Sequence, residues 1–253
     1  MYRGNYLKGV GKKVLSLKKE GYLFHKTVIA ERGKDISVSA DKRINRSLIK
    51  FIKHETPYEV ISEESQTEKS FDSIDDPVWI IDPLDGSLNF ARNIPISCIS
   101  IALWKKQQPL GGVIFDFVHQ RLFSADLDSG TLPRENDMVI RTSRISEINR
   151  SVLCTGFPSW RDYKTKSLSL FVERIQKWKK IRLIGSAALS LAWVASGRAD
   201  AYIEEDIRIW DVAAGLALVK AAGGHIYCKP GSRKNFVTAA ATNGKIPIEA
   251  LIS

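Results

Sequence analysis

The chain has 253 residues and one composition throughout, which suits a single large domain or two tightly joined halves. Hydrophobic residues make up 44% and charged residues 26%, which excludes intrinsic disorder, a collagen and a coiled coil. No apolar run approaches the ~20 residues of a membrane-spanning helix, so we expect no membrane contact.

The cysteines and the first residues bear on the compartment. Cys98, Cys154 and Cys228 are odd in number, far apart and free of any CxxC pairing, which is typical of buried thiols in a reducing environment. Lys and Glu interrupt the first 24 residues too often for a signal peptide. We therefore expect a cytoplasmic protein.

The net charge is +10 and is unevenly spread. Residues 1–60 hold 14 Lys or Arg against 6 Asp or Glu, and residues 161–182 hold 8 against 2. Such a balance favours anionic partners, whether nucleic acid, acidic protein or phosphorylated metabolites. A basic surface that is merely solvated is the more common explanation, because charge runs alone rarely specify a ligand, so charge does not name the function.

The first half of the chain begins with helical patterns and continues with strand patterns. Apolar residues recur at helical spacing within 5–24 and again after a polar start at 39–41, which predicts two helices. A short apolar run at 60–65 ends in carboxylates, and 77–81 has the pattern of a buried strand. From about residue 94, apolar and polar residues alternate through Ser124, which predicts an antiparallel meander.

The second half alternates strand and helix patterns, which predicts an α/β unit with a mostly parallel sheet. The expected strands are 151–155, 181–184, 199–204 and 225–228, and the expected helices are 165–177, 187–196 and 212–222. The seam should lie near 140–150. We therefore predict an N-terminal α+β half over 1–145 and a C-terminal α/β half over 146–253.

The densest chemical signal is the run Asp82-Pro83-Leu84-Asp85-Gly86-Ser87, directly after the strand at 77–81. It places two carboxylates three residues apart, a glycine that lets a ligand approach the backbone, and a serine that can cap a following helix. Exposed N–H groups at such a helix start suit phosphate, and carboxylate oxygens beside phosphate suit Mg²⁺. The alternative is an Asp-rich turn followed by an ordinary helix cap.

Two further acidic positions strengthen the functional interpretation. Glu63 and Glu64 follow a strand-like run, and Asp211 lies where an apolar stretch becomes a helix rich in small residues. Taken alone, Asp211 is typical of a helix cap, and Glu63 is typical of a solvated loop.

Together these residues resemble the inositol monophosphatase family of lithium-sensitive, magnesium-dependent phosphomonoesterases. The family pattern is a Glu-Glu pair, then Asp-Pro-Ile/Leu-Asp-Gly-Thr/Ser after a strand, then Trp-Asp-x-Ala-Ala/Gly-Gly far downstream. All three motifs occur here in order, at 63–64, 82–87 and 210–215, although Ser62 and Ser87 replace a more usual Gly and Thr. Weaker similarity extends from 35–41 to 221–224. The resemblance implies an αβαβα sandwich of the sugar-phosphatase type.

The resemblance also implies roles for these residues. Two or three Mg²⁺ ions per site would be bound by Glu63, Asp82, the Leu84 carbonyl, Asp85 and Asp211. Glu63 would also help to activate the attacking water, with the Ser87 hydroxyl as its partner. The phosphate would lie on the Gly86 and Ser87 N–H groups, and Asp41 and Glu64 would be carboxylates surrounding the metal ligands. The four His (25, 54, 119 and 225) and the three Cys show no triad or zinc spacing, so we assign them no role.

The substrate pocket implied by the resemblance combines a loop and an acid. Gly185-Ser186-Ala187 would lie beside the substrate, and Glu204 would accept hydrogen bonds from its hydroxyls. Arg208 could meet a second anionic group or pair with a neighbouring acid. Relatives that cleave adenosine bisphosphates carry a Lys where this chain has Leu189, which counts against that substrate.

The function that the motifs and the resemblance predict is Mg²⁺-dependent hydrolysis of a small phosphate monoester, an inositol, polyol or sugar phosphate. The resemblance also implies a homodimer, although the sequence itself does not fix the oligomeric state. Fructose-1,6-bisphosphatase and nucleotide 3′-phosphatase activities remain alternatives. A further alternative is a basic protein that binds nucleic acid or transcription machinery and keeps the fold. Nucleic acid is not the partner we expect, because aromatic residues are not interleaved with the basic runs.

Overall fold

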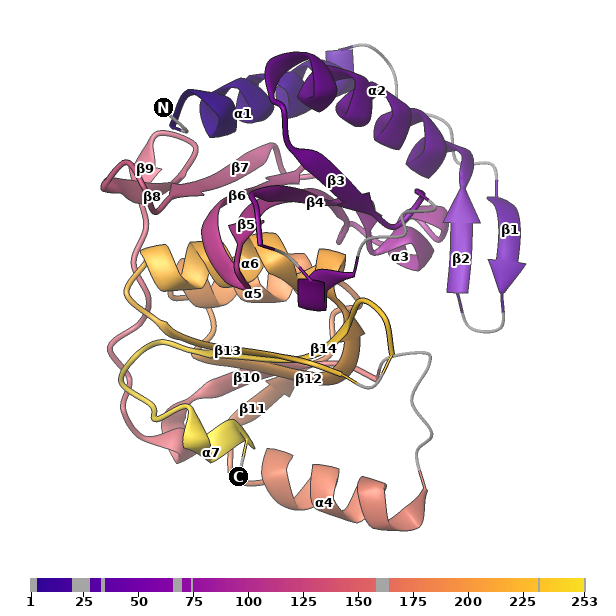
Figure 1. Cartoon of the computed structure of the whole chain (residues 1–253). Helices are drawn as coiled ribbons and strands as arrows, with labels where there is room; N and C mark the ends of the chain where they lie inside the picture. Colours follow the sequence, from indigo (N-terminus) through magenta and orange to yellow (C-terminus); the bar gives the residue numbers. More distant parts are fainter. Residues whose placement is uncertain are drawn as a thin grey trace.

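The computed structural model describes residues 4–19, 28–32, 35–65, 70–73, 75–157, 164–231 and 233–252. Its elements stack in five layers (Figure 1). Helices α1 (Gly4–Lys19) and α2 (Ser39–Glu55) cover a seven-stranded sheet, and helices α5 (Ala187–Ala195) and α6 (Ile209–Ala221) lie beneath it. A five-stranded sheet follows, and α4 (Thr165–Ile175) and α7 (Glu249–Ile252) cover its far side. This is the αβαβα order that we expected.

The outer helices are amphipathic, as their spacing predicts. Leu7, Val10, Val14 and Leu17 of α1 are buried, and so are Ile44, Leu48 and Ile52 of α2. These side chains form one apolar cluster with the sheet below them. Residues 20–24 of the first predicted helix lie outside the described residues. A two-stranded hairpin of β1 (Val28–Arg32) and β2 (Asp35–Val38) precedes α2.

The seven-stranded sheet is antiparallel except at one edge. Its strands are β3 (Glu59–Ser62), β4 (Val78–Asp85), β5 (Cys98–Lys105), β6 (Gln108–Asp116), β7 (Arg121–Asp126), β8 (Thr131–Glu135) and β9 (Met138–Val139), in that spatial order. Only β3 and β4 pair in parallel. The 3₁₀ helix η2 (Phe71–Ser73) lies between them in sequence, and α3 (Ser87–Ala91) follows β4. The predicted meander is confirmed.

The five-stranded sheet is mixed, which corrects the mostly parallel sheet that we expected. After the 3₁₀ helix η3 (Ile148–Arg150), its strands are β10 (Val152–Thr155), β11 (Lys180–Arg182), β12 (Ala201–Arg208), β13 (His225–Pro230) and β14 (Phe236–Thr242). The spatial order is β11-β10-β12-β14-β13. Strands β11, β10 and β12 run parallel, but the β13–β14 hairpin adds two antiparallel pairs.

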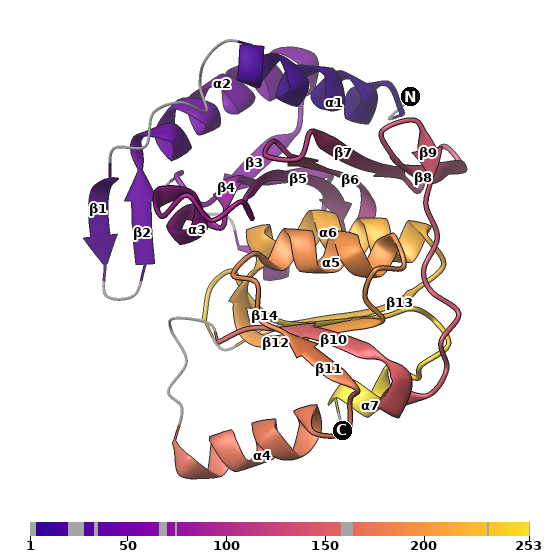
Figure 2. The same cartoon turned by 180° about the vertical axis from the view of Figure 1, so that it is seen from behind.

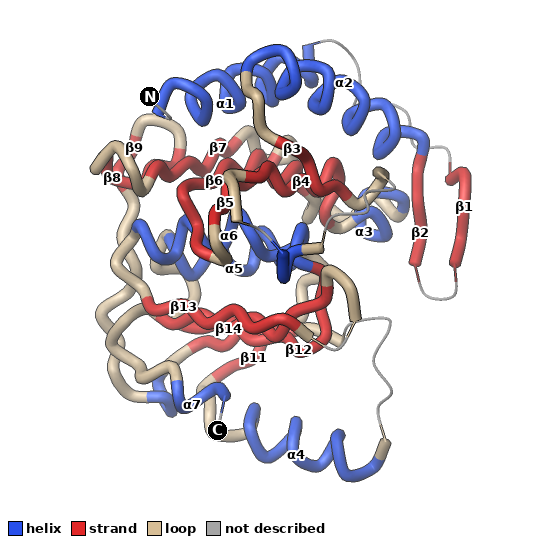
Figure 3. The backbone as a smooth tube through the Cα atoms, in the orientation of Figure 1, coloured by secondary structure: helices blue, strands red, loops and turns tan. Residues whose placement is uncertain are grey.

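Helices α5 and α6 form the centre of the molecule, between the two sheets (Figures 2 and 3). Both are buried nearly all round, because their sequences are apolar on every face. A Cβ at Gly112 of β6 would lie 2.9 Å from the Cα of Ala214, so α6 and β6 are packed backbone against backbone. One apolar cluster joins residues of both sheets to these helices.

Two expectations concern the division of the chain and the membrane. The first sheet ends at Val139 and the second begins at Val152, on either side of residue 145; the division into halves stays a prediction. In the part of the chain that the structure describes, no helix has both the length and the apolarity needed to cross a membrane.

Candidate active site

Strand β4 carries the two aspartates of the central motif into the protein. It extends to Asp85, beyond the strand end that we predicted, and every one of its side chains is buried. Asp82 pairs with Ser100 of β5 and Asp85 with Cys98, with a bulge between them. The bulge falls at Pro83, which has no N–H for the ladder. It separates the two aspartates while keeping both inside the molecule.

The Asp85 carboxylate is held by hydrogen bonds from both halves of the chain. Its Oδ2 accepts from the Ser186 hydroxyl, from the Ala188 N–H at 3.1 Å and from the Cys98 thiol at 3.6 Å. Burial raises the pKa of Asp85 to about 6, and these hydrogen bonds counteract part of that rise. Because all three donors are on Oδ2, a cation would bind through Oδ1.

Asp82 is surrounded by other acids. Its Oδ1 accepts a hydrogen bond from the Leu84 N–H at 2.9 Å. Burial raises the pKa of Asp82 well above its ordinary value, and the nearby charges of Glu63, Asp85 and Asp211 raise it further. Carboxylates from β4, from the turn after β3 and from the first turn of α6 therefore converge on one region.

Helix α3 begins in a different way from our expectation. Gly86, not Ser87, is its capping residue, and no side chain caps it. Gly86 has φ +79°, and a Cβ there would lie 2.8 Å from the Ile96 carbonyl oxygen, so only glycine fits. Ser87 is therefore the first helical residue, half-buried beside the motif.

Asn89, which the sequence analysis did not single out, joins α3 to the loop before α5. Its Nδ2 donates to the carbonyl oxygens of Ile96 at 2.9 Å, Ile184 at 2.8 Å and Gly185 at 3.3 Å. The only sequence signal for this role is a polar residue two positions after Ser87.

A cavity of about 330 Å³ lies where these elements meet. The predicted residues that line it are Glu63, Asp82, Leu84, Asp85, Gly86, Ser87, Gly185, Ser186, Ala187, Glu204 and Asp211. The structure thus brings eleven predicted residues together, although their individual roles stay predictions. Asp41, buried in the first turn of α2, and Glu64, half-buried after β3, are not among the lining residues.

Nine other described residues line the cavity, and of these the sequence analysis considered only Arg208 as a possible contact to a substrate anion. The nine are Leu88, Asn89, Thr155, Gly156, Phe157, Ser190, Asp206, Ile207 and Arg208.

Glu204 faces this cavity from β12. Burial raises its pKa to about 8, although a hydrogen bond with Tyr202 lowers it; the Asp85 charge raises it further. The hydrogen bond between Tyr202 and Glu204 is weak, because the buried Tyr202 hydroxyl has no well-aligned partner among the described residues. A Cβ at Gly156 would lie 2.6 Å from Glu204 Oε1, so this glycine provides the room for the carboxyl group.

The charged residues that follow Glu204 on β12 make two kinds of contact. Glu205 pairs with Arg174 at 2.8 Å, and Asp206 pairs with Arg233. The Arg208 guanidinium instead lies 4.0 Å from the ring centre of Phe236 and 5.1 Å from that of Trp210. Arg208 is the only Lys or Arg among the described residues that line the cavity.

Among the described histidines and cysteines, Cys98 contacts a residue of the candidate site. His54 pairs with Glu55 and His119 with Asp116, both at 2.9 Å, and His225 is exposed; His25 lies outside the described residues. Cys98, to which we assigned no role, touches Asp85 through its thiol.

The residues fit a divalent metal by their chemistry. Among the described residues, no three His, Cys, Asp or Glu side chains are gathered into a ready-made metal site. The donors are all oxygen atoms, two of the carboxylates are buried, and three neighbouring acids raise the pKa of Asp82. A hard cation such as Mg²⁺ suits this arrangement.

Comparisons with known proteins agree with this geometry. The model of the inositol monophosphatase family matches residues 6–246. The Nus factor SuhB of Xylella fastidiosa is 37% identical over 201 residues, covering 79% of this chain and 71% of that protein. An inositol-1-monophosphatase of Synechocystis is 36% identical over 227 residues, covering 86% and 77%. The structure of an inositol monophosphatase from Anabaena superposes with a TM-score of 0.79 at 31% identity, covering 95% and 91%. The chain belongs to the inositol monophosphatase family.

Proposed function

We propose that this protein is a Mg²⁺-dependent phosphatase of small polyol or sugar monophosphates. The observation that carries the proposal is the convergence of Glu63, Asp82, Asp85 and Asp211 on one cavity beside Gly86. Two of these acids, Asp82 and Asp85, are buried, and buried charges are costly unless cations neutralise them. Family membership and the similarity to an inositol-1-monophosphatase support the same activity.

In this proposal each residue of the site has a distinct role. Glu63, Asp82, Asp85, Asp211 and the Leu84 carbonyl hold two or three Mg²⁺ ions. When bound, these ions supply the charge that activates water and stabilises the leaving oxygen. Glu63, which is exposed at the cavity, accepts the proton of the attacking water with help from the Ser87 hydroxyl. Backbone N–H groups at Gly86 and Ser87 hold the phosphate oxygens.

The substrate preference follows from Glu204 and the loop before α5. The Glu204 carboxyl faces the cavity, where it exchanges hydrogen bonds with the hydroxyl groups of a polyol. Leu189 is buried in α5 and offers no charge to a nucleotide phosphate. We therefore favour a polyol or sugar monophosphate over an adenosine bisphosphate. Fructose bisphosphate is a weaker candidate, because Arg208 is the single Lys or Arg among the described residues that line the cavity.

We extend the proposal to the oligomeric state of the protein, its compartment and its inhibition. We propose a cytoplasmic homodimer that lithium inhibits. Leu132, Met138 and Val139, exposed apolar side chains at the β8–β9 edge of the seven-stranded sheet, support an association surface there.

A second candidate function is binding of nucleic acid or transcription machinery. Several relatives are named Nus factor SuhB, so our expectation that nucleic acid is not a partner is not supported. The uneven basic charge of the chain favours this second candidate as well.

The test of the proposed activity is phosphate release from a panel of polyol, sugar and nucleotide phosphates with Mg²⁺. Asp82→Asn removes a buried charged ligand, so we expect activity on the best substrate to fall roughly 100-fold or more. Asp75→Asn, at an exposed position, is the matched control and should keep full activity. Apo stability should not fall, because a repelled buried charge is removed. Near-normal activity of Asp82→Asn at saturating Mg²⁺ would contradict the assignment.

A further inference from the structure

The outer helices carry most of the net charge of the molecule. Together α1 and α2 contain ten Lys or Arg against two Asp or Glu, a net charge of +8 in a chain whose total is +10. These helices form the outermost layer over the seven-stranded sheet (Figure 1). The cavity of the candidate active site is lined by other elements. The positive charge is therefore concentrated on a face that the proposed hydrolysis does not use.

A basic groove of about 630 Å³ lies between these two helices. Its walls are Lys13 of α1 and Arg43, Arg46, Lys50 and His54 of α2. Ser47 and Phe51 complete it, and the Phe51 ring packs toward α1, where a Cβ at Gly9 would lie 3.6 Å away. The groove is thus a cavity with cationic walls and one apolar side chain that is engaged in helix packing.

The cations of α2 form a regular row. Arg43, Arg46, Lys50 and Lys53 follow at intervals of three or four residues, so they share one face and succeed each other roughly every 4.5–6 Å along the helix. All four are exposed. A row of this length exceeds what one small phosphate can contact. It matches a polymer that carries one negative charge per unit at regular intervals.

Three cations of the row, Arg46, Lys50 and Lys53, have no acidic partner in a salt bridge within the described ranges. Of the two acids in α1 and α2, Asp41 is buried in the first turn of α2, and Glu55 is paired with His54 at 2.9 Å. The charges of Arg46, Lys50 and Lys53 therefore face solvent, where they attract an external polyanion.

We propose that the α1–α2 groove binds a single strand of nucleic acid through its phosphate backbone. The groove presents one row of cations, which matches the single phosphate backbone of one strand, whereas a duplex presents two backbones. A strand presents evenly spaced phosphates to the row, and Arg and Lys are the side chains that bind them. An acidic peptide fits less well, because the groove offers no apolar pocket for its other side chains. This inference does not depend on the proposed hydrolysis.

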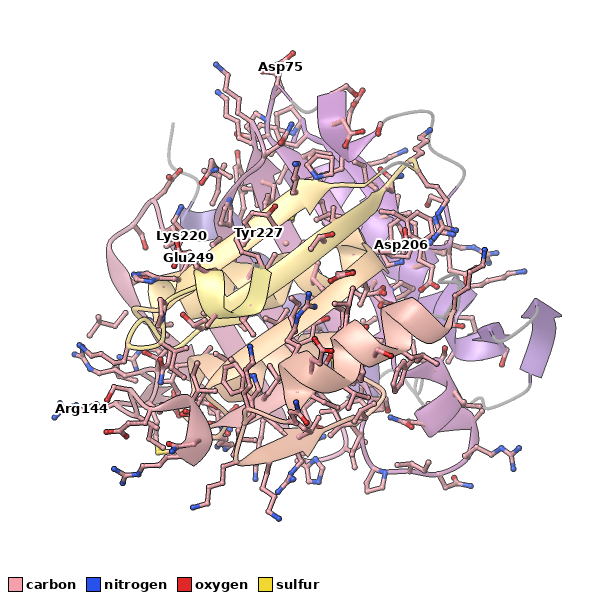
Figure 4. The ribbon with its side chains drawn as sticks, turned by 90° about the horizontal axis from the view of Figure 1, so that it is seen from below. Asp75, Arg144, Asp206, Lys220, Tyr227 and Glu249 are labelled. Carbon is pink, nitrogen blue, oxygen red and sulfur yellow. The ribbon has the colours of Figure 1, made fainter. Side chains whose placement is uncertain are left out.

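The test compares two variants with the same loss of charge. The groove variant combines Arg46→Gln and Lys50→Gln, which line the groove, with Lys53→Gln, which continues the row beyond it. Gln keeps high helix propensity. The control is Arg144→Gln, Lys179→Gln and Lys245→Gln, at exposed positions outside the outer helices; Arg144 is labelled in Figure 4. Binding of a fluorescent single-stranded oligouridylate is measured by anisotropy between 50 and 200 mM salt. A duplex of equal length and an oligoglutamate are further probes.

We expect the groove variant to bind the strand at least about tenfold more weakly. The slope of log K against log salt should decrease by about 2, since each phosphate contact on a single strand contributes roughly 0.7. The control should bind like the parent protein. Equal losses in both variants, or no loss in the groove variant, would overturn the proposal. Tighter binding of the duplex or of oligoglutamate would overturn the choice of partner.

Circular dichroism establishes that the variants are folded. Phosphate release, measured on the same samples, should be unchanged in both, because no substituted residue lines the catalytic cavity. That assay reports on the proposed hydrolysis separately, so the failure of one proposal is distinguishable from the failure of the other.

Discussion

Glu204 is a carboxyl group whose protonation differs between the folded and the unfolded chain. Its folded pKa is about 8, against an ordinary value of 4.5. The folded state therefore binds a proton more tightly than the unfolded state does. The stability that this provides is complete below pH 4.5 and is lost as the pH rises through 8.

We predict that Glu204→Gln flattens this pH dependence. Gln stays neutral at both pH values. In the absence of metal, the free energy of unfolding of the variant minus that of the parent should therefore be about 1–3 kcal/mol larger at pH 8 than at pH 5. The range allows for the part of the side chain that reaches solvent. Urea unfolding in EDTA at both pH values measures it. Glu249→Gln on α7, labelled in Figure 4, is the control and should show no such difference. A pH-independent effect of Glu204→Gln would contradict the prediction.

At the residue scale the sequence predicts the acids of the site better than their supports. Asp82, Asp85 and Asp211 stand in recognisable motifs, because a metal site needs particular side chains at fixed spacing. Asn89 donates hydrogen bonds to main-chain carbonyl oxygens, and Cys98 donates one to the Asp85 carboxylate. Several other residue types could make these contacts. The roles of Asn89 and Cys98 become visible only when distant strands and loops are brought together.

Ser186 connects two elements, since its hydroxyl caps α5 and donates to Asp85. It accepts a hydrogen bond from the Leu189 N–H at 3.2 Å. Ser186→Ala should lower the free energy of unfolding by about 1–2 kcal/mol. The pKa of Asp85 should rise, because the lost hydrogen bond lowers it in the parent. Urea unfolding and Mg²⁺ titration calorimetry across pH 5.5–7.5 measure these effects.

In the Ser186→Ala variant, the pH at which Mg²⁺ binding is half-maximal should move upward. The control is Ser196→Ala at the other end of α5, where the hydroxyl donates only to main-chain oxygens. An unchanged pH dependence in Ser186→Ala would show that this hydroxyl does not govern Asp85.

The contact between α5 and α6 depends on the absence of a side chain at Gly215. A Cβ there would overlap Leu191 of α5. Gly215→Ala should therefore destabilise the protein by about 1–3 kcal/mol, despite the better helix propensity of Ala. Gly9→Ala in α1 is the matched control; its Cβ would meet Phe51 at an ordinary 3.6 Å. We expect that control to be neutral or to gain about 0.5–1 kcal/mol. Equal effects in thermal unfolding would contradict this interpretation.

At the element scale the sequence indicates type better than extent. The helices and the meander are found because their apolar residues repeat at 3.6 or 2 positions. Strand β14 is missed because its segment is rich in Ala and Thr, whose hydrophobicity does not alternate. Strand β12 runs four residues beyond its predicted end. There a bulge between Glu204 and Ile207, with Asp206 at φ +61°, continues the pairing through a charged run.

The whole molecule has a core that both halves share. Ile80 of β4, Leu191 of α5 and Val237 of β14 belong to one apolar cluster. We therefore predict a single cooperative unfolding transition, although the seam predicted near residue 145 suggests two units. Urea unfolding followed by far-UV circular dichroism and by tryptophan fluorescence should give coincident curves.

Tryptophan-to-phenylalanine variants localise that signal. Trp79 and Trp104 report on the first sheet, and Trp178 reports on the cluster beneath the second. Two separate transitions, with Trp178 responding at a different urea concentration from Trp79, would show that the halves fold independently.

The separation of charge between the outer helices and the cavity also makes the molecule electrically asymmetric. Cations are gathered in the α1–α2 layer, and six carboxyl groups line the cavity with one guanidinium. Such a distribution is a permanent electric dipole moment, and an external field exerts a torque on it. Near a polyanion the molecule rotates before it touches, and the outer helices arrive first. The cavity, which those helices do not line, then remains open to small solutes from the surrounding water.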